Sequence, residues 1–294
     1  MRIAGRHDAA GPPVSLSARM VRSNTTPIAL LIPVWNRQSK LERALRSLIP
    51  EAALLKVVVI DDGSDPPARI DRDLPLDVHL IRLPSNQGIA EALNAGLAYS
   101  FAQGIPYIAR LDSDDVAVEG RFRKQLALME QDESIGICGG GYYSCALDGT
   151  RIATVLNPRT HTAIRRGMHL RTTLWHPTVM IRTSVAQRVG AFNAALKCED
   201  VEYFLRVLDV ARAANLPEPL ICYEVGAADT LTGTAGRRRA IARELMQLKL
   251  RRPEPLDPLW WLGFAANTTY YLGVNRPFAA LGDRVMRLID RQGG

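Results

Sequence analysis

The sequence lacks several patterns that would point to a compartment or a metal site at once. Its 4 cysteines are Cys138, Cys145, Cys198 and Cys222, and none forms a C-x-x-C pair, so neither a zinc site nor a disulfide framework is indicated. No charge-free apolar run reaches the roughly 18 residues that a membrane-spanning helix needs. Residues 1–26 contain no continuous apolar stretch of the kind found in secretory signals, and they read as a loose tail. We therefore expect a cytoplasmic protein with reduced thiols.

Motifs for binding nucleic acid are also missing. Lys and Arg (37) exceed Asp and Glu (30), and a net charge of +7 favours anionic partners such as nucleotides, lipid headgroups or nucleic acid. However, no zinc-finger spacing, basic region with heptads or paired aromatic motif accompanies this charge. We therefore expect no nucleic-acid partner. With 294 residues, 47% of them hydrophobic, the chain can form one large domain with a buried core, alone or with a small appendage. The sequence does not decide between a monomer and an oligomer.

Apolar runs alternate with amphipathic segments over the first part of the chain. The pattern predicts strands at 28–34, 54–60, 77–83 and 106–111, with helices at 36–48 and 86–104. Uninterrupted apolar strands that alternate with helices indicate a parallel sheet covered on both faces. Ligands of such sheets bind beyond the carboxyl ends of the strands. The loops expected at that edge are residues 34–37, 61–65, 86–88 and 112–115.

The pattern changes after residue 120. It predicts helices at 121–131, 184–192 and 199–211 and strands at 135–145 and 176–182. From about residue 237 the chain reads as helical, and basic residues precede an aromatic stretch at 258–274.

Two acidic turns stand at the ends of predicted strands. Asp112, Asp114 and Asp115 crowd three carboxylates into four positions, which suits a hard divalent cation with oxygen ligands. The alternative is a solvated turn that caps a helix starting near Val116. A second acidic turn, "IDDGSD" (60–65), strengthens the first interpretation, because a carboxylate at a strand end can accept hydrogen bonds from a base or ribose.

Taken in order, these motifs resemble those of family 2 glycosyltransferases. The matching segments are "IPVWNR" (32–37), "VVVIDDGSD" (57–65), "NQGIAEALNAG" (86–96), "ARLDSDD" (109–115), "HPTVMIR" (176–182), "GAF" (190–192) and "CEDVEYFLRV" (198–207). The resemblance covers roughly residues 28–225. It implies an inverting, metal-dependent, hexosyltransferase-like enzyme that uses a nucleotide-sugar donor. Bacterial surface-polysaccharide or glycolipid assembly is the process that the resemblance suggests.

The resemblance also implies a fold and a division of the chain. We expect an α/β protein of GT-A type, with a Rossmann-like, mixed, mainly parallel sheet flanked by helices and a helical C-terminal appendage. The glycosyltransferase domain would span 27–235, with a nucleotide-binding half at 27–120 and an acceptor half at 121–235. Residues 236–294 would form the basic, aromatic appendage.

The donor site is carried over from the family residue by residue. The expected nucleotide-binding residues are Pro33, Val34, Trp35, Asn36, Asp61, Asp62, Asn86, Gly88, Arg110 and Asp112. Among these, Asp62 matches the base-binding aspartate better than Asp61. Trp35 either borders the base or packs as an ordinary aromatic, and Arg110 either contacts the nucleotide or only neutralises Asp112. The donor would be a UDP-sugar, with dTDP- and GDP-sugars as alternatives.

Metal binding is expected at the second acidic turn. Asp114 and Asp112 match the family's DxD motif, and they would hold Mn²⁺ or Mg²⁺ against the diphosphate. Asp115 would be an outer-shell or helix-capping residue. Many relatives add a histidine in a Tyr-Arg-x-His element, but here Tyr223 is followed by Glu224, and Gly226 stands where the histidine would be. Glu224 or Asp229 are the candidate replacements.

Catalysis is expected at the pair Glu199 and Asp200. In an inverting displacement a general base removes the proton of the acceptor hydroxyl, and Asp200 is the candidate for that base, with Glu199 positioning either Asp200 or the acceptor. The alternative for both residues is a simple electrostatic preference for a helix N-terminus. His176 is open between a contact to acceptor or metal and a structural role.

The C-terminal segment and the overall function leave competing interpretations. Basic residues beside tryptophans and tyrosines suit either a helix at an anionic membrane surface, here the inner face of the plasma membrane, or an appendage packed on the domain. The acceptor would be a glycan or a lipid-linked glycan. A metal-dependent nucleotidyltransferase is disfavoured, since no glycine-rich phosphate loop follows the first strand. A catalytically silent homologue acting as a binding or assembly subunit is the remaining alternative.

Overall fold

A mixed nine-stranded sheet organises the part of the chain that the structure, a computed structural model, describes: residues 26–225 and 235–271. The strand order is β3-β2-β1-β4-β8-β6-β9-β5, and β7 pairs with β6 outside this path. The strands are β1 (Ile28–Val34), β2 (Leu55–Asp61), β3 (Asp77–Arg82), β4 (Tyr107–Arg110), β5 (Val116–Ala117), β6 (Ile135–Cys145), β7 (Arg151–Val155), β8 (Met180–Arg182) and β9 (Arg212–Glu224).

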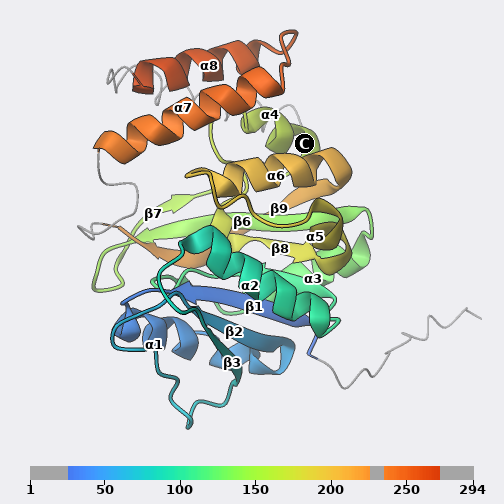
Figure 1. Cartoon of the computed structure of the whole chain (residues 1–294). Coiled ribbons are helices and arrows are strands. Elements are labelled where there is room, and N and C mark those ends of the chain that lie inside the picture. The colour runs from blue at the N-terminus through green and yellow to red at the C-terminus, as the bar shows by residue number, and fades with distance from the viewer. Residues whose placement is uncertain (1–25, 226–234, 272–294) are drawn as a thin grey trace, which may run out of the picture.

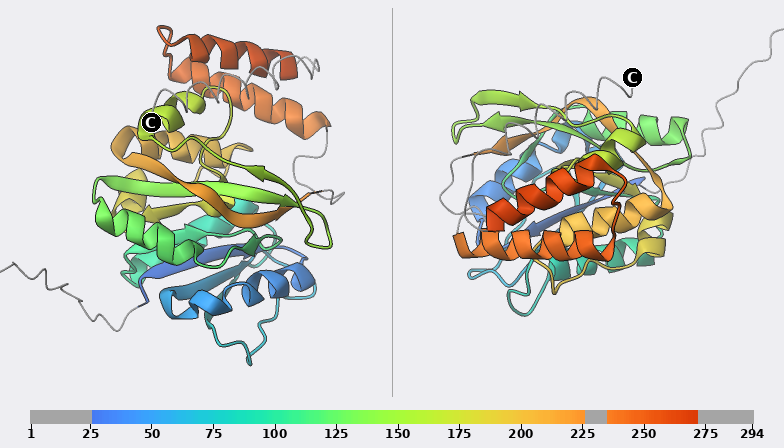
Figure 2. Two further views of the ribbon diagram at one scale, coloured as in Figure 1. Left: turned by 180° about the vertical axis from the view of Figure 1, so that it is seen from behind. Right: turned by 90° about the horizontal axis from the view of Figure 1, so that it is seen from above.

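Helices cover both faces of this sheet, as Figures 1 and 2 show. They are α1 (Gln38–Arg46), α2 (Ile89–Ala102), α3 (Arg121–Gln131), α4 (His161–Gly167), α5 (Thr183–Val189), α6 (Glu199–Val210), α7 (Ala235–Arg251) and α8 (Pro258–Tyr271), with short 3-10 turns η1 (Ile49–Leu54) and η2 (His176–Thr178). The helices predicted at 121–131 and 199–211 agree with α3 and α6 to within one residue.

The first four strands form the expected parallel unit. β1 pairs in parallel with β2 and β4, and β2 pairs in parallel with β3. The sheet then changes direction, because β8 is antiparallel to both β4 and β6, whereas β6 and β9 are parallel. The expectation of a mixed, mainly parallel sheet flanked by helices is therefore confirmed.

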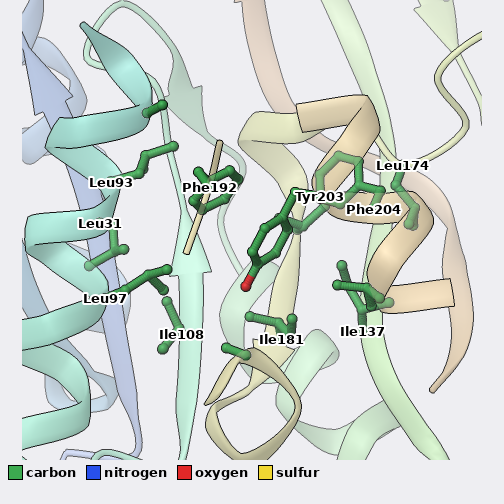
Figure 3. Packing of buried hydrophobic residues seen from close by; sticks show 14 of the residues in the cluster. Leu31, Leu93, Leu97, Ile108, Ile137, Leu174, Ile181, Phe192, Tyr203 and Phe204 are labelled. Carbon is green, nitrogen blue, oxygen red and sulfur yellow. The ribbon is translucent and has the colours of Figure 1, made fainter. Parts of the chain in front are cut away.

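Alternate residues of each strand enter two different hydrophobic cores. One side of the sheet packs on α2, α5 and α6, and the other on α1 and α3. Figure 3 shows the first core, where Phe192 stacks on Tyr203 with ring centroids 3.9 Å apart and Leu93 and Leu97 of α2 face the strands. Because both sides of the sheet are buried, the strands have apolar residues at successive positions, which is the pattern the sequence displays.

Several local expectations were wrong. No helix begins near Val116, because Val116 and Ala117 pair with β9 as strand β5, and α3 begins only at Arg121. The strand expected at 176–182 is a 3-10 turn followed by the short β8. Three elements, β7, β9 and α4, were not predicted from the sequence.

The expectation of reduced thiols fails for one pair of cysteines. Cys145 and Cys222 form a disulfide with their Cα atoms 5.8 Å apart, while Cys138 and Cys198 are free and buried.

The C-terminal helices lie side by side over α6 and α4 (Figures 1 and 2). Ion pairs join this hairpin to the domain: Arg166 contacts Asp257 at 2.9 Å, and Arg165 contacts Glu254 at 3.0 Å. Trp260 is 4% exposed, so at least this aromatic packs inside the molecule. Among the described residues no helix is both long and apolar enough to cross a membrane. Residues 272–274 of the expected aromatic stretch, and the rest of the expected appendage up to residue 294, lie outside the described residues.

Candidate active site

The four loops predicted at the sheet edge are linked to one another. The backbone N–H of Asn36 donates to Ser64 Oγ (2.9 Å), and the N–H of Asp65 donates to Asn36 Oδ1 (2.8 Å). An ion pair between Arg37 and Asp114 connects the first loop with the 112–115 turn. The carboxyl ends of β1, β2 and β4 lie next to each other in the sheet, which explains why loops so far apart in sequence meet here.

Two adjacent aspartates fix the loop after β2. Asp61 is fully buried, and it accepts hydrogen bonds from Ser64 N, Ala68 N and Arg82. Burial acts to raise the pKa of Asp61, but these hydrogen bonds and the charge of Arg82 lower it below its usual value. Both carboxylate oxygens of Asp61 are thus already bound by groups of the protein itself.

Asp62 instead joins that loop to the 86–88 turn. Its two carboxylate oxygens accept from Gln87 N (2.7 Å) and Gly88 N (2.9 Å). Gly63, at φ +69°, lets the two loops touch, since a Cβ there would lie 2.4 Å from the carbonyl carbon of Ser85. Asn86 is exposed at the tip of the turn. The predicted residues Asp62, Asn86 and Gly88 therefore form one structural unit.

The residues expected at the end of β1 differ in exposure. Val34 is buried, Pro33 is partly buried and Asn36 is exposed. The Trp35 side chain is 48% exposed, so it is not a packed core aromatic. An exposed indole at the sheet edge is available to a flat ligand.

The 112–115 turn presents two of its three carboxylates to solvent. The side chains of Asp112 and Asp114 are 29% and 32% exposed, and Arg110 Nη2 contacts Asp112 Oδ1 at 2.7 Å. Burial and the negative charge of Asp112 raise the pKa of Asp114, while Arg37 acts in the opposite direction. Clustered carboxylates with a raised pKa are a place where an additional cation would be favoured.

Asp115 is the buried member of the cluster. It is 1% exposed, and neither of its carboxylate oxygens has a hydrogen-bond partner among the described residues. Burial, together with the charges of Asp112 and Asp114, raises the pKa of Asp115 well above its usual value. Since β5 follows it directly, Asp115 does not cap a helix, and that expectation was wrong.

A buried arginine that the sequence analysis did not single out stands beside this cluster. Arg121 is fully buried, donates to the carbonyl oxygen of Arg110 (2.6 Å), and burial lowers its pKa to about 9, against the effect of Asp115. Arg110 itself is 3% exposed. Two buried guanidinium groups thus offset part of the charge of three aspartates, and no sequence signal distinguishes Arg121 from any other helical arginine.

The donor set of this turn fits a hard divalent cation. Asp114 Oδ2 and Asp112 Oδ1 take part in the ion pairs described above. Mg²⁺ or Mn²⁺ commonly takes one or two protein carboxylates and completes its shell with phosphate oxygens and water. Within the described ranges, no group of three acidic, histidine or cysteine side chains converges as a metal cage. The ligands would therefore be Asp114 and Asp112, with the rest of the shell supplied by the substrate.

Glu224, one candidate for a further ligand, is already engaged. Lys40 Nζ contacts its carboxylate at 2.8 Å, and Arg43 contacts the other oxygen. Burial acts to raise the pKa of Glu224, but these two cations of α1 lower it. Glu224 therefore ties β9 to α1. The other candidate position, Asp229, and Gly226 lie outside the described residues.

One member of the acidic pair at the start of α6, Asp200, is within electrostatic range of the same turn. Glu199 is 8% exposed and Asp200 is partly buried. Burial raises the pKa of Asp200, the N–H of Val201 counteracts this by donating to Oδ1 (2.8 Å), and the charges of Arg110 and Asp112 are close enough to contribute. The fold thus brings residues about ninety positions apart into electrostatic contact at one site.

His176 lies beside the site but is embedded among aromatic rings. Its ring centroid is 5.6 Å from that of Phe204 and 5.8 Å from that of Phe192. Burial, aided by the charge of Arg110, lowers the pKa of His176 well below its usual value. A neutral imidazole packed in this way supports the structural alternative.

Solved structures identify the class of fold. The structure of S. aureus TarS 1-349 in complex with UDP-GlcNAc superimposes with a TM-score of 0.60 at 15% identity, covering 85% of this chain and 73% of that one. The mannosyltransferase PcManGT from Pyrobaculum calidifontis, in complex with GDP-Man and Mn²⁺, gives a TM-score of 0.56 at 17% identity, covering 91% and 76%. The protein has the GT-A fold of glycosyltransferases.

Sequence comparison then defines the family. The model of glycosyl transferase family 2 matches residues 29–193, more than half of the chain, and this protein belongs to that family. An uncharacterized glycosyltransferase of Haemophilus influenzae is 29% identical over 66% of this chain and 72% of its own length. The amylovoran biosynthesis glycosyltransferase AmsE of Erwinia amylovora is 26% identical over 83% and 91%. The putative glycosyltransferase EpsE of Bacillus subtilis is 25% identical over 66% and 71%.

Proposed function

We propose that this glycosyltransferase moves a sugar from a nucleoside-diphosphate sugar to an acceptor hydroxyl, with inversion at the anomeric carbon. The observation that carries the proposal is that the charges of Arg110 and Asp112, an ion pair in the acidic turn, act on the carboxyl group of Asp200. A partly buried, proton-accepting carboxylate is thereby within electrostatic range of the turn where a diphosphate would be held. Binding of substrate and acceptance of a proton at one centre are the two requirements of the reaction.

Asp200 is the general base of the proposed mechanism. As the acceptor oxygen attacks the anomeric carbon, its proton passes to the Asp200 carboxylate, and the bond to the nucleoside diphosphate breaks on the opposite side. Burial raises the pKa of Asp200, which makes it a better proton acceptor than a solvated aspartate. Glu199, buried next to it, would position Asp200 or the acceptor.

The donor would lie across the linked loops. Trp35 and the unit of Asp62, Asn86 and Gly88 border the base, while Asp112 lies toward the ribose. A UDP-sugar is the first candidate, with dTDP- and GDP-sugars as alternatives, and the UDP-GlcNAc of TarS and the GDP-Man of PcManGT support a nucleotide sugar. Mn²⁺ or Mg²⁺ at Asp114 and Asp112 would offset the charge that builds on the leaving diphosphate.

The acceptor class is proposed from relatives and from the surface. AmsE is named for amylovoran biosynthesis, which supports a glycan or lipid-linked glycan acceptor in surface-polysaccharide assembly. Leu256 and Trp261, 96% and 55% exposed, lie on the same hairpin as the basic residues of α7. This combination supports peripheral contact with an anionic membrane surface, which in this proposal is the inner face of the plasma membrane.

Release of nucleoside diphosphate from a panel of UDP-, dTDP- and GDP-sugars tests the function. The assay is run with Mn²⁺, with Mg²⁺ and with chelator, for the wild-type protein and for Asp200→Asn, Asp114→Ala and the exposed control Asp148→Asn. We expect turnover with one donor, a loss of about 10²- to 10⁴-fold in Asp200→Asn, and an unchanged control.

Binding and turnover are measured separately, because a silent homologue would bind without reacting. Donor binding by calorimetry with no turnover of any donor would favour the assembly-subunit alternative. Release of pyrophosphate rather than nucleoside diphosphate would favour nucleotidyl transfer.

A further inference from the structure

A cavity lies away from the donor loops, between α6 and the α7–α8 hairpin. Its volume is about 380 Å³, within the range of small-molecule sites. Apolar side chains of both layers form much of its wall, among them Val201, Leu205 and Leu208 of α6, Leu245 and Leu248 of α7, and Trp260 of α8. Figure 1 shows these helices stacked above the sheet.

Contacts at both ends of α6 set the length of this cavity. At the N-terminal end, Glu244 of α7 accepts from the backbone N–H of Lys197 (2.7 Å), and at the C-terminal end Arg252 pairs with Asp209 (2.5 Å). The helices therefore run in the same direction along each other. From Val201 to Leu208 the wall extends roughly 10 Å, which is room for one short apolar chain.

The charges around the cavity do not balance. It is bordered by the bases Arg165, His169, Arg171, Lys249 and Arg252 and by the acids Asp209 and Glu254. Arg165 and His169 contact Glu254, and Arg252 pairs with Asp209. This leaves Lys249 and Arg171 without a carboxylate partner among the lining residues.

Lys249 is the more informative of these two cations. Its ammonium nitrogen is buried, has no hydrogen-bond partner among the described residues, and lies 6.0 Å from the centroid of the Trp260 ring. Burial lowers the pKa of Lys249 to about 8, although Glu254 and Asp257 act in the opposite direction. A buried ammonium without a partner is unfavourable, and an anion at this position would relieve it.

We propose that this cavity binds an amphiphile with a single short apolar chain and an anionic headgroup, the chain lying along α6 and the headgroup pairing with Lys249. The apolar wall supplies the affinity for the chain, and the unpaired ammonium supplies the preference for a negative headgroup. The site is separate from the donor loops, so it does not depend on the proposed reaction.

The test is calorimetric titration of the full chain with four probes. The two charged amphiphiles are used below their micellar concentrations, and decanol is used below its solubility limit. Decyl phosphate carries both features, decanol only the chain, inorganic phosphate only the anion, and decyltrimethylammonium the opposite charge. We expect saturable binding of decyl phosphate, with each of the other three at least about tenfold weaker.

Matched variants then locate the site. Lys249→Met is expected to weaken decyl phosphate about tenfold and leave decanol unchanged, Lys249→Arg to retain binding, and Leu205→Trp to abolish it by filling the cavity. Lys124→Met is the control, since Lys124 lies on α3 and pairs with Glu218. Thermal unfolding of each variant checks that it is folded, and the Lys249 pair decides the question even if Leu205→Trp does not fold.

Three outcomes would overturn the proposal. They are absence of saturable decyl phosphate binding, equal binding of the cationic amphiphile, and binding that Lys249→Met leaves unchanged. Donor turnover, measured in parallel, is not expected to change in Lys249→Met, so this result is distinguishable from failure of the proposed reaction.

Discussion

At the scale of single residues, the site divides its carboxylates between scaffold and chemistry. Asp61, Asp62 and Glu224 have their oxygens bound by neighbouring backbone or cations, which fixes the loops. Asp114 keeps a partly exposed side chain, and Asp200 a raised pKa, which are the properties expected of a ligand and a base. The same residue type therefore does different work according to its surroundings.

The protonation of Asp200 predicts the pH dependence of turnover. Only the ionised carboxylate can accept a proton, so the rate rises with pH through the pKa of Asp200. Because burial raises this pKa above 3.8, the acid limb of kcat is expected at higher pH than a solvated aspartate would give. Asp200→Asn should lose the limb together with most of the activity. An identical acid limb in the residual activity of this variant would assign the limb to another group.

Among the helices and strands, a contact with a distant segment can stabilise a helix end that has no local cap. α3 begins after Gly120, at φ +82°, and no side chain of the adjoining residues caps it. The carboxylate of Glu51 instead accepts from the backbone N–H groups of Phe122 (3.3 Å) and Arg123 (2.9 Å). η1 thereby caps a helix seventy residues further along the chain and fixes the segment that follows the acidic turn.

Removal of this distant cap is expected to destabilise the protein. Glu51→Ala leaves two N–H groups at the start of α3 without an acceptor, and it should lower the free energy of unfolding by about 1–2 kcal/mol. Urea denaturation measures the effect. Glu130→Ala, at an exposed position of the same helix, is the control and should stay within about 0.5 kcal/mol. Equal effects of the two substitutions would contradict a capping role for Glu51.

At the scale of the whole molecule, the C-terminal hairpin completes one wall over α6. It approaches the domain closely at Gly263 of α8, where a Cβ would lie 1.7 Å from the carbonyl oxygen of His169. No side chain fits between these two backbones, so the docking of the hairpin requires glycine at this position. The cavity between α6 and the hairpin exists only while the hairpin is docked.

A methyl group at this contact is therefore expected to displace the hairpin. Gly263→Ala should increase hydrogen exchange in α7 and α8 and expose Trp260, which shifts tryptophan emission to longer wavelength. Gly236→Ala in α7 meets nothing within 4 Å, so it should leave exchange unchanged and gain up to about 1 kcal/mol from helix propensity. Unchanged exchange in Gly263→Ala would show that the contact is not required.

The parallel half of the sheet, from β1 to β4, and the helices α2 and α3 could be predicted from the sequence, because each of these depends on local periodicity and turn residues. It also located the acidic turns, since strand ends are marked by an abrupt change from apolar to polar residues. The order of the motifs indicated the family. Because these features are local, they can be predicted without knowing which segments of the chain are in contact.

The pairings between distant segments, in contrast, became visible only in the tertiary structure. It turned Val116–Ala117 into a strand because β9 passes beside it, joined Cys145 to Cys222 across neighbouring strands, and engaged Glu224 with α1 rather than leaving it for a metal. It also placed Lys249 beside a cavity, where its ammonium has no hydrogen-bond partner in the described part of the chain. Such contacts depend on the register and direction of strands and on helix docking, and no spacing along the chain encodes them.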